Sequence, residues 1–320
     1  MDILNLKPAL KEIIWGGNRM QDGYGFSSDA ANIAEAWMLS AHSAGPSVVC
    51  GGEDDGLTLS EAIEKHSKAV LGTKCADLPD FPLLVKFIDA RERLSVQVHP
   101  DNEYARRVEN ENGKTEAWYV LACDEGAELI YGFADDLTKE ECREAIEQGT
   151  LLEKCNRVAV KPGDVCFIPA GTLHAIGAGI LLAEVQQSSN VTYRVFDYNR
   201  KDKNGNPREL HVDKALDVVE LTRPERDFSA EGKVEIIDGG TAQLLASCDY
   251  FSMTSLVLDG ETVRNADETS FVSLLVTDGE GRIAGKTADT ALHKGSCLFV
   301  PASYGAFTLQ GNMKIVEIRV

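Results

Sequence analysis

A short segment in the first third of the chain places two possible metal ligands side by side. In LSVQVHP, residues 94–100, apolar residues alternate with Ser95, Gln97 and His99, which is the period of a half-buried strand. Gln97 and His99 therefore share a face, with Cα atoms roughly 7 Å apart. At that spacing both side chains could reach one ion.

Two further candidate ligands follow later in the chain. Glu116 lies in the alternating segment KTEAW, residues 114–118, on one face with Lys114. His174 ends a run in which the turn KPGD at 161–164 precedes a short apolar strand and a second Pro/Gly turn. This strand–turn–strand unit is expected to hold His174 in a fixed direction.

Together the four side chains offer two imidazoles, one carboxylate and one amide oxygen. A nitrogen and oxygen set without thiolate suits zinc, and also manganese, iron or nickel. Either histidine alone would more simply be a structural residue, but all four side chains together favour a metal site. Ligands contributed by separate strands can leave open positions on the ion, which is typical of a catalytic centre.

Charged residues in neighbouring segments indicate the chemistry around such an ion. Arg194 lies in an alternating strand, and Glu184 lies in a mostly apolar strand before it. Lys86 interrupts a buried strand at 81–90, so its ammonium either reaches a cavity with an anion or the strand lies at a sheet edge. Lys114 and Arg194 beside a metal in an acidic protein suggest an anionic small molecule. An acid–base group there suits proton transfer next to a carbonyl.

Length and charge exclude several classes of protein. The chain has 320 residues, a hydrophobic content of 43% and a formal net charge of -19. This acidic excess argues against nucleic acid or an anionic membrane surface as a partner. The sequence has no secretion signal, no apolar run near the roughly 20 residues of a membrane span, and no Cys-x-x-Cys pair. We therefore expect a cytoplasmic protein with reduced thiols.

The elements that must position these residues are mainly strands. Capping boxes at Thr58–Glu61 and Thr138–Glu141 predict two helices, the first ending at Gly72. An i, i+3, i+4, i+7 stripe predicts a third helix at 212–219. Beyond residue 233 the chain is strand-like with frequent turns, which is the pattern of an all-β sandwich or barrel.

The sequence also contains a faint internal repeat. KGSCLFVPA at 294–302 follows the pattern of PGDVCFIPA at 162–170, and extending the alignment puts Ala306 where His174 stands. The second copy thus keeps the strand–turn scaffold without the ligand. The segment TRPERD at 222–227 is interpreted as a linker. We predict two β-barrels of one ancestry, with a site in the first.

These residues resemble a known family. The turn, strand and histidine of residues 163–174 look like the second cupin motif. SVQVHP at 95–100 followed by KTE at 114–116 is similar to type I mannose-6-phosphate isomerases (phosphomannose isomerases) in their short bacterial form. The first cupin motif has glutamine where many cupins have histidine, which fits this family. Further matching segments are 15–17, 35–37, 81–86, 169–174 and 190–194.

The resemblance implies a mainly β fold of two cupin-like jelly-roll β-barrels with a few short helices. Residues 1–228 would form the catalytic domain with short helical insertions, and residues 229–320 a barrel that lacks metal ligands. A cytoplasmic enzyme of carbohydrate metabolism is implied, which interconverts mannose 6-phosphate and fructose 6-phosphate as a monomer or a homodimer. The implied cofactor is one zinc ion per chain, held by Gln97, His99, Glu116 and His174.

For the mechanism, we expect the open-chain sugar to bind with its C1 and C2 oxygens near zinc. A base would then move the proton between these carbons through a cis-enediol intermediate. Arg194 is implied as a catalytic residue that stabilises the oxyanion, and Lys114 and Glu184 are both candidates for the base. The expected substrate contacts are Lys86, Glu35, Trp37 and Ser95.

Two other interpretations stay open. Another cupin metalloenzyme could use the same ligands, either as an oxygenase or on a different phosphosugar; an oxygenase would consume dioxygen. A sugar-binding protein with two cupin barrels would perform no catalysis. Such a protein needs no acid–base group, so Lys114, Arg194 and Glu184 beside the ligands argue against it.

Overall fold

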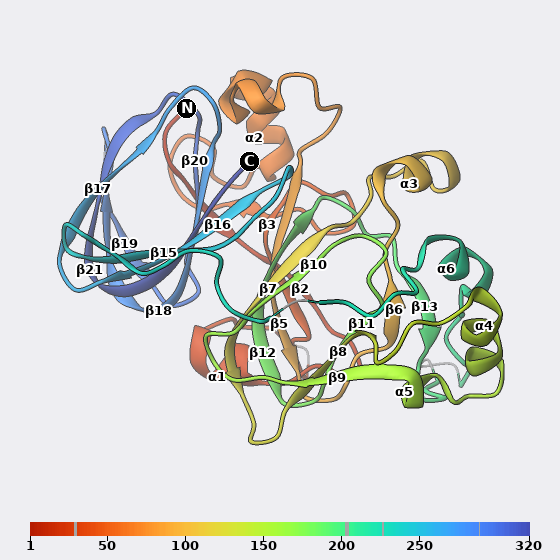
Figure 1. Cartoon of the computed structure of the whole chain (residues 1–320). Coiled ribbons are helices and arrows are strands. Elements are labelled where there is room, and N and C mark those ends of the chain that lie inside the picture. Colours follow the sequence, from red (N-terminus) through yellow and green to blue (C-terminus); the bar gives the residue numbers. More distant parts are fainter. Residues whose placement is uncertain (29–30, 202–204, 226, 288) are drawn as a thin grey trace.

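The computed structural model of the chain describes residues 1–28, 31–201, 205–225, 227–287 and 289–320 and is built mainly from β-strands (Figure 1). Within these ranges the strands form three sheets, of ten, six and five strands. In Figure 1 the ten-stranded sheet lies at the left, and helices α4 and α6 lie at the opposite side. In the same ranges no helix is both long and apolar enough to span a bilayer.

The ten-stranded sheet contains every strand of the C-terminal part, which confirms the all-β prediction for the chain beyond residue 233. It also takes in two strands from the N-terminal part, because β1 pairs antiparallel with β20, with Leu4 opposite Phe299, and β4 pairs with β1. Residue 226 of the predicted linker lies outside the described residues. The strands of this sheet are β1 (Leu4–Lys7), β4 (Val48–Val49), β14 (Glu235–Ile237), β15 (Gly240–Ser247), β16 (Ser252–Leu258), β17 (Glu261–Ala266), β18 (Val272–Ala284), β19 (Asp289–His293), β20 (Cys297–Val300) and β21 (Gly305–Arg319).

The other two sheets contain the predicted ligand strands. The six-stranded sheet has the order β10-β7-β12-β5-β3-β2 and the five-stranded sheet the order β13-β6-β11-β8-β9. The first comprises β2 (Ala9–Lys11), β3 (Glu35–Ser40), β5 (Leu83–Ala90), β7 (Glu116–Cys123), β10 (Val165–Ile168) and β12 (Ile180–Gln187). The second comprises β6 (Val96–Val98), β8 (Glu128–Phe133), β9 (Cys155–Ala159), β11 (His174–Ile176) and β13 (Tyr193–Phe196).

Both predicted capping boxes are present, with Thr58 and Thr138 as N-caps. The predicted end of the first helix at Gly72 is wrong. The helix ends at His66, because Ser67 adopts a positive φ of 77° and the chain continues as a 3₁₀ turn. The helices are α1 (Arg19–Tyr24), α2 (Leu59–His66), α3 (Asn102–Val108), α4 (Lys139–Glu147), α5 (Leu151–Lys154) and α6 (Val212–Val218), with 3₁₀ turns η1 (Lys68–Leu71) and η2 (Thr73–Cys75).

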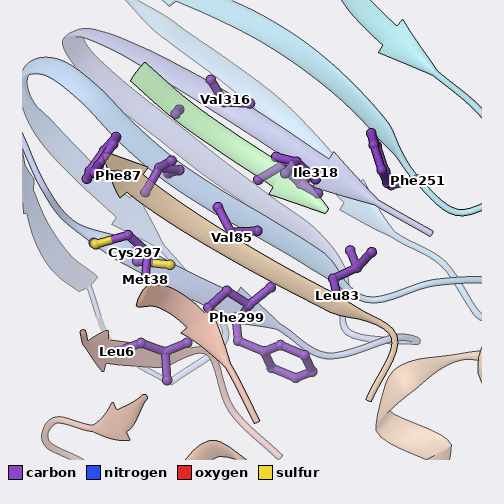
Figure 2. Packing of buried hydrophobic residues seen from close by; sticks show 14 of the residues in the cluster. Leu6, Met38, Leu83, Val85, Phe87, Phe251, Cys297, Phe299, Val316 and Ile318 are labelled. Atoms are coloured by element: carbon purple, nitrogen blue, oxygen red, sulfur yellow. The ribbon is translucent and has the colours of Figure 1, made fainter. Parts of the chain in front are cut away.

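A hydrophobic core joins the six-stranded and ten-stranded sheets. Val85 and Phe87 of β5 pack against Phe299, Val316 and Ile318 of the ten-stranded sheet, and all five are at most 1% exposed (Figure 2). The apolar face of β5 that points away from Lys86 is buried here. This packing fixes the position of β5, and with it Lys86, relative to the C-terminal strands.

The predicted internal repeat is reproduced in the backbone. Gly163 and Gly295 occupy equivalent turn positions with φ of 97° and 92°, a left-handed conformation that favours glycine. Their N–H groups donate to the carbonyls of Val120 and Val276, each at 2.9 Å. The turns therefore attach β10 and β20 to equivalent partner strands, β7 and β18. Where the first copy continues into His174, the second has Ala306.

A buried ion-pair cluster in the C-terminal part leads to a stability prediction. Glu317 is 3% exposed and accepts hydrogen bonds from Arg264 at 2.8 and 2.9 Å and from Arg319 at 3.0 Å. Burial alone would raise the pKa of Glu317, but the hydrogen bonds and charges of the two arginines hold it below its usual value. The carboxylate therefore stabilises the fold above the ordinary glutamate pKa of about 4.3.

We expect Glu317→Gln to lower the free energy of unfolding by about 2 kcal/mol at pH 7, because it removes charge-assisted hydrogen bonds from a buried group. The difference from the wild type should shrink as the pH falls below about 4.3, because Glu317 then becomes protonated in the unfolded wild type, and it should be lost below the lowered pKa of the folded protein. Urea unfolding across this pH range measures both effects. The exposed Glu261 of β17 provides a control, Glu261→Gln, and an equal loss in both variants would contradict the prediction.

Candidate metal centre and active site

Cross-strand pairing brings the predicted site residues into two rows. In the five-stranded sheet, His174 of β11 lies opposite Gln97 of β6, and Gln97 lies opposite Arg194 of β13. Residues directly opposite in antiparallel strands point to the same face of the sheet. His174, Gln97 and Arg194 therefore form one row.

The second row lies in the six-stranded sheet. Glu184 of β12 is opposite Trp118 of β7 on one side and Lys86 of β5 on the other, and Lys86 is opposite Trp37 of β3. β5 lies between β12 and β3, so Lys86 does not lie on an edge strand. This excludes the edge-strand alternative for Lys86 that the sequence left open.

Three of the four predicted metal ligands form a compact buried cluster. One ligand atom from each of His99, Glu116 and His174 lies within 4.8 Å of the others, and the three residues are at most 1% exposed. The Nδ1 atom of His99 donates to the carbonyl of Val191, and that of His174 to the carbonyl of Thr172, each at 2.8 Å. Both Nε2 atoms are thereby left as acceptors, the form in which histidine binds a metal.

Burial keeps both imidazoles neutral. It lowers the pKa of His174 to about 4, and burial together with the nearby charge of Lys114 lowers the pKa of His99 well below its usual value. A neutral imidazole at pH 7 is the form required of a metal ligand.

Glu116 has the environment of a carboxylate that binds a cation. It is completely buried, and one of its oxygens forms an ion pair of 2.7 Å with Nζ of Lys114. Its oxygens lie 3.3 Å from Nε2 of His174 and 3.8 Å from Nε2 of His99. Burial raises the pKa of Glu116 to about 7, which the charge of Lys114 only partly offsets. A buried carboxylate that lies between two imidazole acceptors fits a divalent metal ion.

Gln97 lies beside this cluster. Its Nε2 is 3.4 Å from Nε2 of His174, and its Oε1 accepts a hydrogen bond of 3.4 Å from Ser95. Both contacts are long, so the amide is weakly held. Its role as a fourth ligand stays a prediction.

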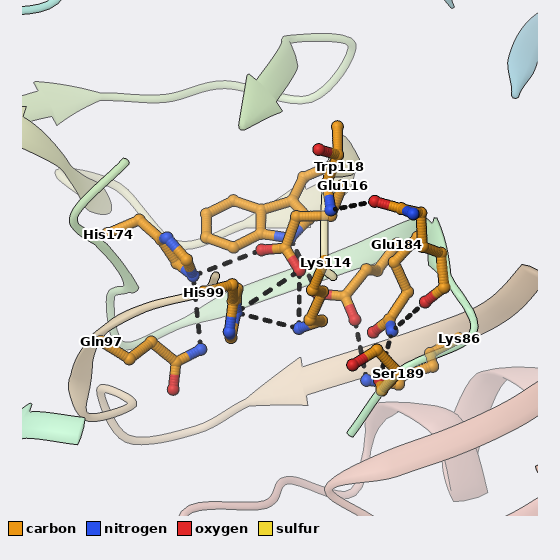
Figure 3. A network of polar contacts seen from close by, with 12 residues as sticks. Lys86, Gln97, His99, Lys114, Glu116, Trp118, His174, Glu184 and Ser189 are labelled. Atoms are coloured by element: carbon orange, nitrogen blue, oxygen red, sulfur yellow. Dashed lines mark hydrogen bonds and ion pairs between the residues drawn. The ribbon is translucent and has the colours of Figure 1, made fainter. Parts of the chain in front are cut away.

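Lys114 is in direct contact with two of the cluster residues (Figure 3). Its Nζ lies 2.7 Å from a carboxylate oxygen of Glu116 and 3.0 Å from Nε2 of His99. The side chain of Lys114 is 6% exposed. A lysine amine thus lies at the edge of the candidate metal centre, where it could exchange a proton with a bound molecule.

Glu184, the other candidate base, is held on both oxygens. It accepts 2.9 Å hydrogen bonds from Nζ of Lys86 and from the indole N–H of Trp118. Burial would raise its pKa, but the charges of Lys86 and Lys114 and these two hydrogen bonds lower it to about 2. An acceptor so stabilised in its ionised form is a weak base.

A cavity of about 190 Å³ is lined by Lys114 and Glu184, and its lining does not include His99, Glu116 or His174. Predicted residues in its lining are Glu35, Lys86, Ser95, Gln97, Lys114, Glu184 and Arg194. Trp37 is not part of this lining; its indole donates to Glu35 at 2.7 Å and lies 5.4 Å from Nζ of Lys86. Trp37 therefore contacts Glu35 and Lys86 from outside the cavity.

The sequence analysis missed Arg208, which lines the same cavity. Its guanidinium lies 3.4 Å from Asp197. The pKa of Arg194 is lowered by burial and, to a smaller extent, by the nearby charge of Arg208. Arg208 follows a turn-rich stretch with no periodicity, so no strand or helix pattern could place it. Its charge in an acidic chain was the remaining signal.

Comparisons with known proteins agree with this geometry. The mainly β fold and a buried His–Glu–His cluster with a lysine define a cupin-type protein with a candidate metal centre. Residues 3–128 match the family described as phosphomannose isomerase type I, catalytic domain, and residues 241–320 match the mannose-6-phosphate isomerase cupin domain. The chain belongs to the type I phosphomannose isomerase family.

Several relatives match over nearly the whole chain. The chain is 42% identical to the mannose-6-phosphate isomerase ManA of Bacillus subtilis over 315 residues, which cover 98% of this chain and 97% of the relative. It is 38% identical to the mannose-6-phosphate isomerase of Streptococcus mutans, over 98% and 96% of the two chains. The crystal structure of a Bacillus subtilis mannose 6-phosphate isomerase superposes with a TM-score of 0.92 at 37% identity, covering 100% of both chains.

Proposed function

We propose that this chain is a zinc-dependent aldose–ketose isomerase that interconverts mannose 6-phosphate and fructose 6-phosphate. The observation that supports this most is the buried cluster of His99, Glu116 and His174 with Lys114 in contact. Isomerisation of this kind needs a polarised carbonyl and a group that moves a proton between neighbouring carbons. The names of the relatives give the same reaction for those proteins.

Zinc is the proposed ion because the donors are imidazole nitrogens and a carboxylate without thiolate. His99, Glu116 and His174 would hold it, with Gln97 as a fourth ligand through its amide oxygen. When bound, such an ion polarises the carbonyl or hydroxyl oxygen of a sugar.

The chain's own residues then divide the remaining work. Lys114 is the proposed base, which moves the proton between C2 and C1 of the open-chain sugar through a cis-enediol. Glu184 is the weaker candidate because both of its oxygens are hydrogen-bonded and its pKa is about 2. Arg194, in the row of Gln97, is proposed to stabilise the developing oxyanion.

The phosphate end of the substrate is assigned to Arg208. Arg194 and Arg208 are like charges close together, and a bound dianion between or beside them would relieve their repulsion. Lys86 is less suited to this role because Glu184 already pairs with it at 2.9 Å. Lys86, Glu35 and Ser95 are proposed to contact the sugar hydroxyls, with Trp37 supporting Glu35.

Arg208→Gln is expected to raise KM for the phosphosugar roughly 10–100-fold, the equivalent of one lost charge-assisted hydrogen bond, with a smaller change in kcat. Steady-state kinetics measure the split. Arg157→Gln is the charge-matched control, because Arg157 pairs with Glu128 and is not among the residues that line this cavity. A KM within twofold of the wild type in Arg208→Gln would show that the phosphate binds elsewhere.

The finer architecture is also a proposal. We propose two cupin-like jelly-roll barrels, with residues 1–228 as the catalytic domain and 229–320 as a barrel without metal ligands. The division is not complete in space, since β1 and β4 hydrogen-bond within the sheet of the C-terminal strands. The repeated turns at Gly163 and Gly295 support the common barrel ancestry. A cytoplasmic location and a monomeric or homodimeric state complete the proposal.

The test is a coupled assay of the purified protein on mannose 6-phosphate, before chelation, after chelation and after zinc is restored. Turnover that is lost with the chelator and returns with zinc supports the reaction and the metal together. No turnover by zinc-loaded protein would overturn mannose 6-phosphate as the substrate. Exchange of solvent deuterium into other hexose phosphates would then separate another isomerase from a binding protein, which gives no exchange.

A further inference from the structure

The segment that leads into β7 passes very close to the start of α3. A Cβ atom at Gly113 would lie 2.4 Å from the backbone nitrogen of Asn102 and from the carbonyl carbon of Asp101. Any residue other than glycine would therefore push this segment away from the helix. Lys114, the proposed base, follows directly, and Glu116, a proposed metal ligand, comes two residues later. The contact at Gly113 thus helps to fix the backbone position of Lys114 and Glu116.

Two side-chain amides, the half-buried Asn102 and the buried Gln187, hold this segment from outside the cavity. Oδ1 of Asn102 accepts from the N–H of Gly113 at 2.9 Å and from Nε2 of Gln187 at 3.1 Å. Oε1 of Gln187 accepts from the N–H of Thr115 at 3.0 Å, and the backbone N–H of Gln187 donates to the carbonyl of Thr115 at 3.2 Å. Gln187 is 6% exposed. Asn102 and Gln187 therefore hold the residue before Lys114 and the residue after it.

Asn102 and Gln187 are called the clamp below, and through Asn102 the clamp also contacts the C-terminal part of the chain. Nδ2 of Asn102 donates to the hydroxyl of Tyr250 at 3.3 Å. Tyr250 lies in the turn between β15 and β16. Asn102 thus joins the active-site segment on one side to the C-terminal strands on the other.

We propose that Asn102 and Gln187 are positioning residues for Lys114 and Glu116, and that Tyr250 is the contact through which the C-terminal part supports them. This rests on the proposed isomerase function. Neither amide lines the cavity around Lys114 and Arg194, so both act through the backbone at 113–115. Lys114 has a long, flexible side chain, and a displacement of about 1 Å at a reacting group can cost on the order of 100-fold in rate.

The test compares Asn102→Ala, Asn102→Asp and a control, Tyr104→Phe. Aspartate keeps the oxygen that accepts from Gly113 and Gln187, whereas alanine removes it. Tyr104→Phe removes a 3.1 Å hydrogen bond to Asp217 from the same helix without touching residues 113–115. Hydrogen exchange of the backbone at 113–117, kcat, KM and the melting temperature are measured for each.

Asn102→Ala is expected to lower kcat roughly 10–100-fold with KM within about threefold, since the proposed phosphate contact is untouched. Exchange at 113–117 should rise in the same variant. Asn102→Asp should restore most of kcat, and Tyr104→Phe should change neither quantity. Tyr250→Phe should raise exchange at 113–117 by a smaller amount, and unchanged exchange would remove Tyr250 from the clamp.

Unchanged exchange and kcat in Asn102→Ala would overturn the proposal, as would equal losses of kcat in Asn102→Ala and Tyr104→Phe. Failure of Asn102→Asp to restore kcat would also count against the acceptor role. If the wild type does not act on mannose 6-phosphate, the isomerase proposal fails by itself. The exchange data then still decide whether the clamp holds the segment.

Discussion

Glu116→Gln is expected to abolish tight zinc binding and to lower kcat by about 1,000-fold or more. The substitution removes the buried negative charge that lies between His99 and His174. The two neutral imidazoles and an amide would then have to stabilise a divalent cation in a buried site next to the ammonium of Lys114. Losing the several kcal/mol that such an ion contributes corresponds to this rate loss at about 1.4 kcal/mol per tenfold.

The same substitution should also change how the stability of the metal-free protein depends on pH. Burial raises the pKa of Glu116 to about 7, so the folded chain binds a proton more tightly than the unfolded chain does. Its stability therefore falls as the pH rises from the ordinary glutamate pKa of about 4.3 towards 7. Glutamine carries no charge at any pH. Between about pH 4.3 and pH 7, metal-free Glu116→Gln should therefore lose less stability with rising pH than the metal-free wild type.

Zinc per chain after dialysis, melting temperature with and without chelator, and kcat measure these effects together. Glu184→Gln is the matched control, because it neutralises a second buried carboxylate that is not a proposed ligand. Glu184→Gln should keep its zinc. Full zinc occupancy in Glu116→Gln would exclude Glu116 as a ligand.

Lys114→Met is expected to lower kcat about 1,000-fold, within the 100- to 10,000-fold range of a lost general base, and to stop deuterium exchange from solvent into the substrate. Methionine keeps the approximate length of the side chain and removes the amine. The variant should hold zinc at least as tightly as the wild type. The lost ammonium lies 2.7 Å from Glu116 and 3.0 Å from His99, where it competes with a bound cation.

The comparison with Lys86→Met separates the loss of a base from the loss of a positive charge. Both lysines line one cavity, and each is paired with a buried glutamate, Lys86 with Glu184 and Lys114 with Glu116. Lys86→Met should slow turnover and still permit deuterium exchange. Near-normal kcat in Lys114→Met would exclude the lysine as the base.

Local rules made two features of the site predictable from the sequence. These are the strand faces on which Gln97 and Glu116 lie, and the turn before His174. Alternation places side chains on one face, and Pro/Gly turns fix direction. The capping boxes at Thr58 and Thr138 were equally local, and both are present. The compact cluster of three of the predicted ligands also needs contact between two sheets, since Glu116 lies in the six-stranded sheet and His174 in the five-stranded sheet.

Other features depend on contacts between distant parts of the chain and could not be predicted. Glu184 was a candidate base by residue type, but its partners Lys86 and Trp118 lie 98 and 66 residues away in sequence. Arg208 reaches the cavity from a segment without periodicity. The helix α3 has an Asp101 N-cap but a short and weakly apolar sequence, so its pattern gave no helix signal. The sequence also gave no sign that β1 joins the C-terminal sheet.

The pairing of β1 with β20 has a consequence for biosynthesis. β1 is made long before its partner β20, since Leu4 pairs with Phe299. Contacts so far apart in sequence form slowly, because a long loop must close before they contribute. Until β20 is made, β1 can pair with β4 but not with its second partner. We therefore expect the N-terminal part of the chain, which carries the predicted metal ligands, to complete its folding only after the C-terminal strands have been made.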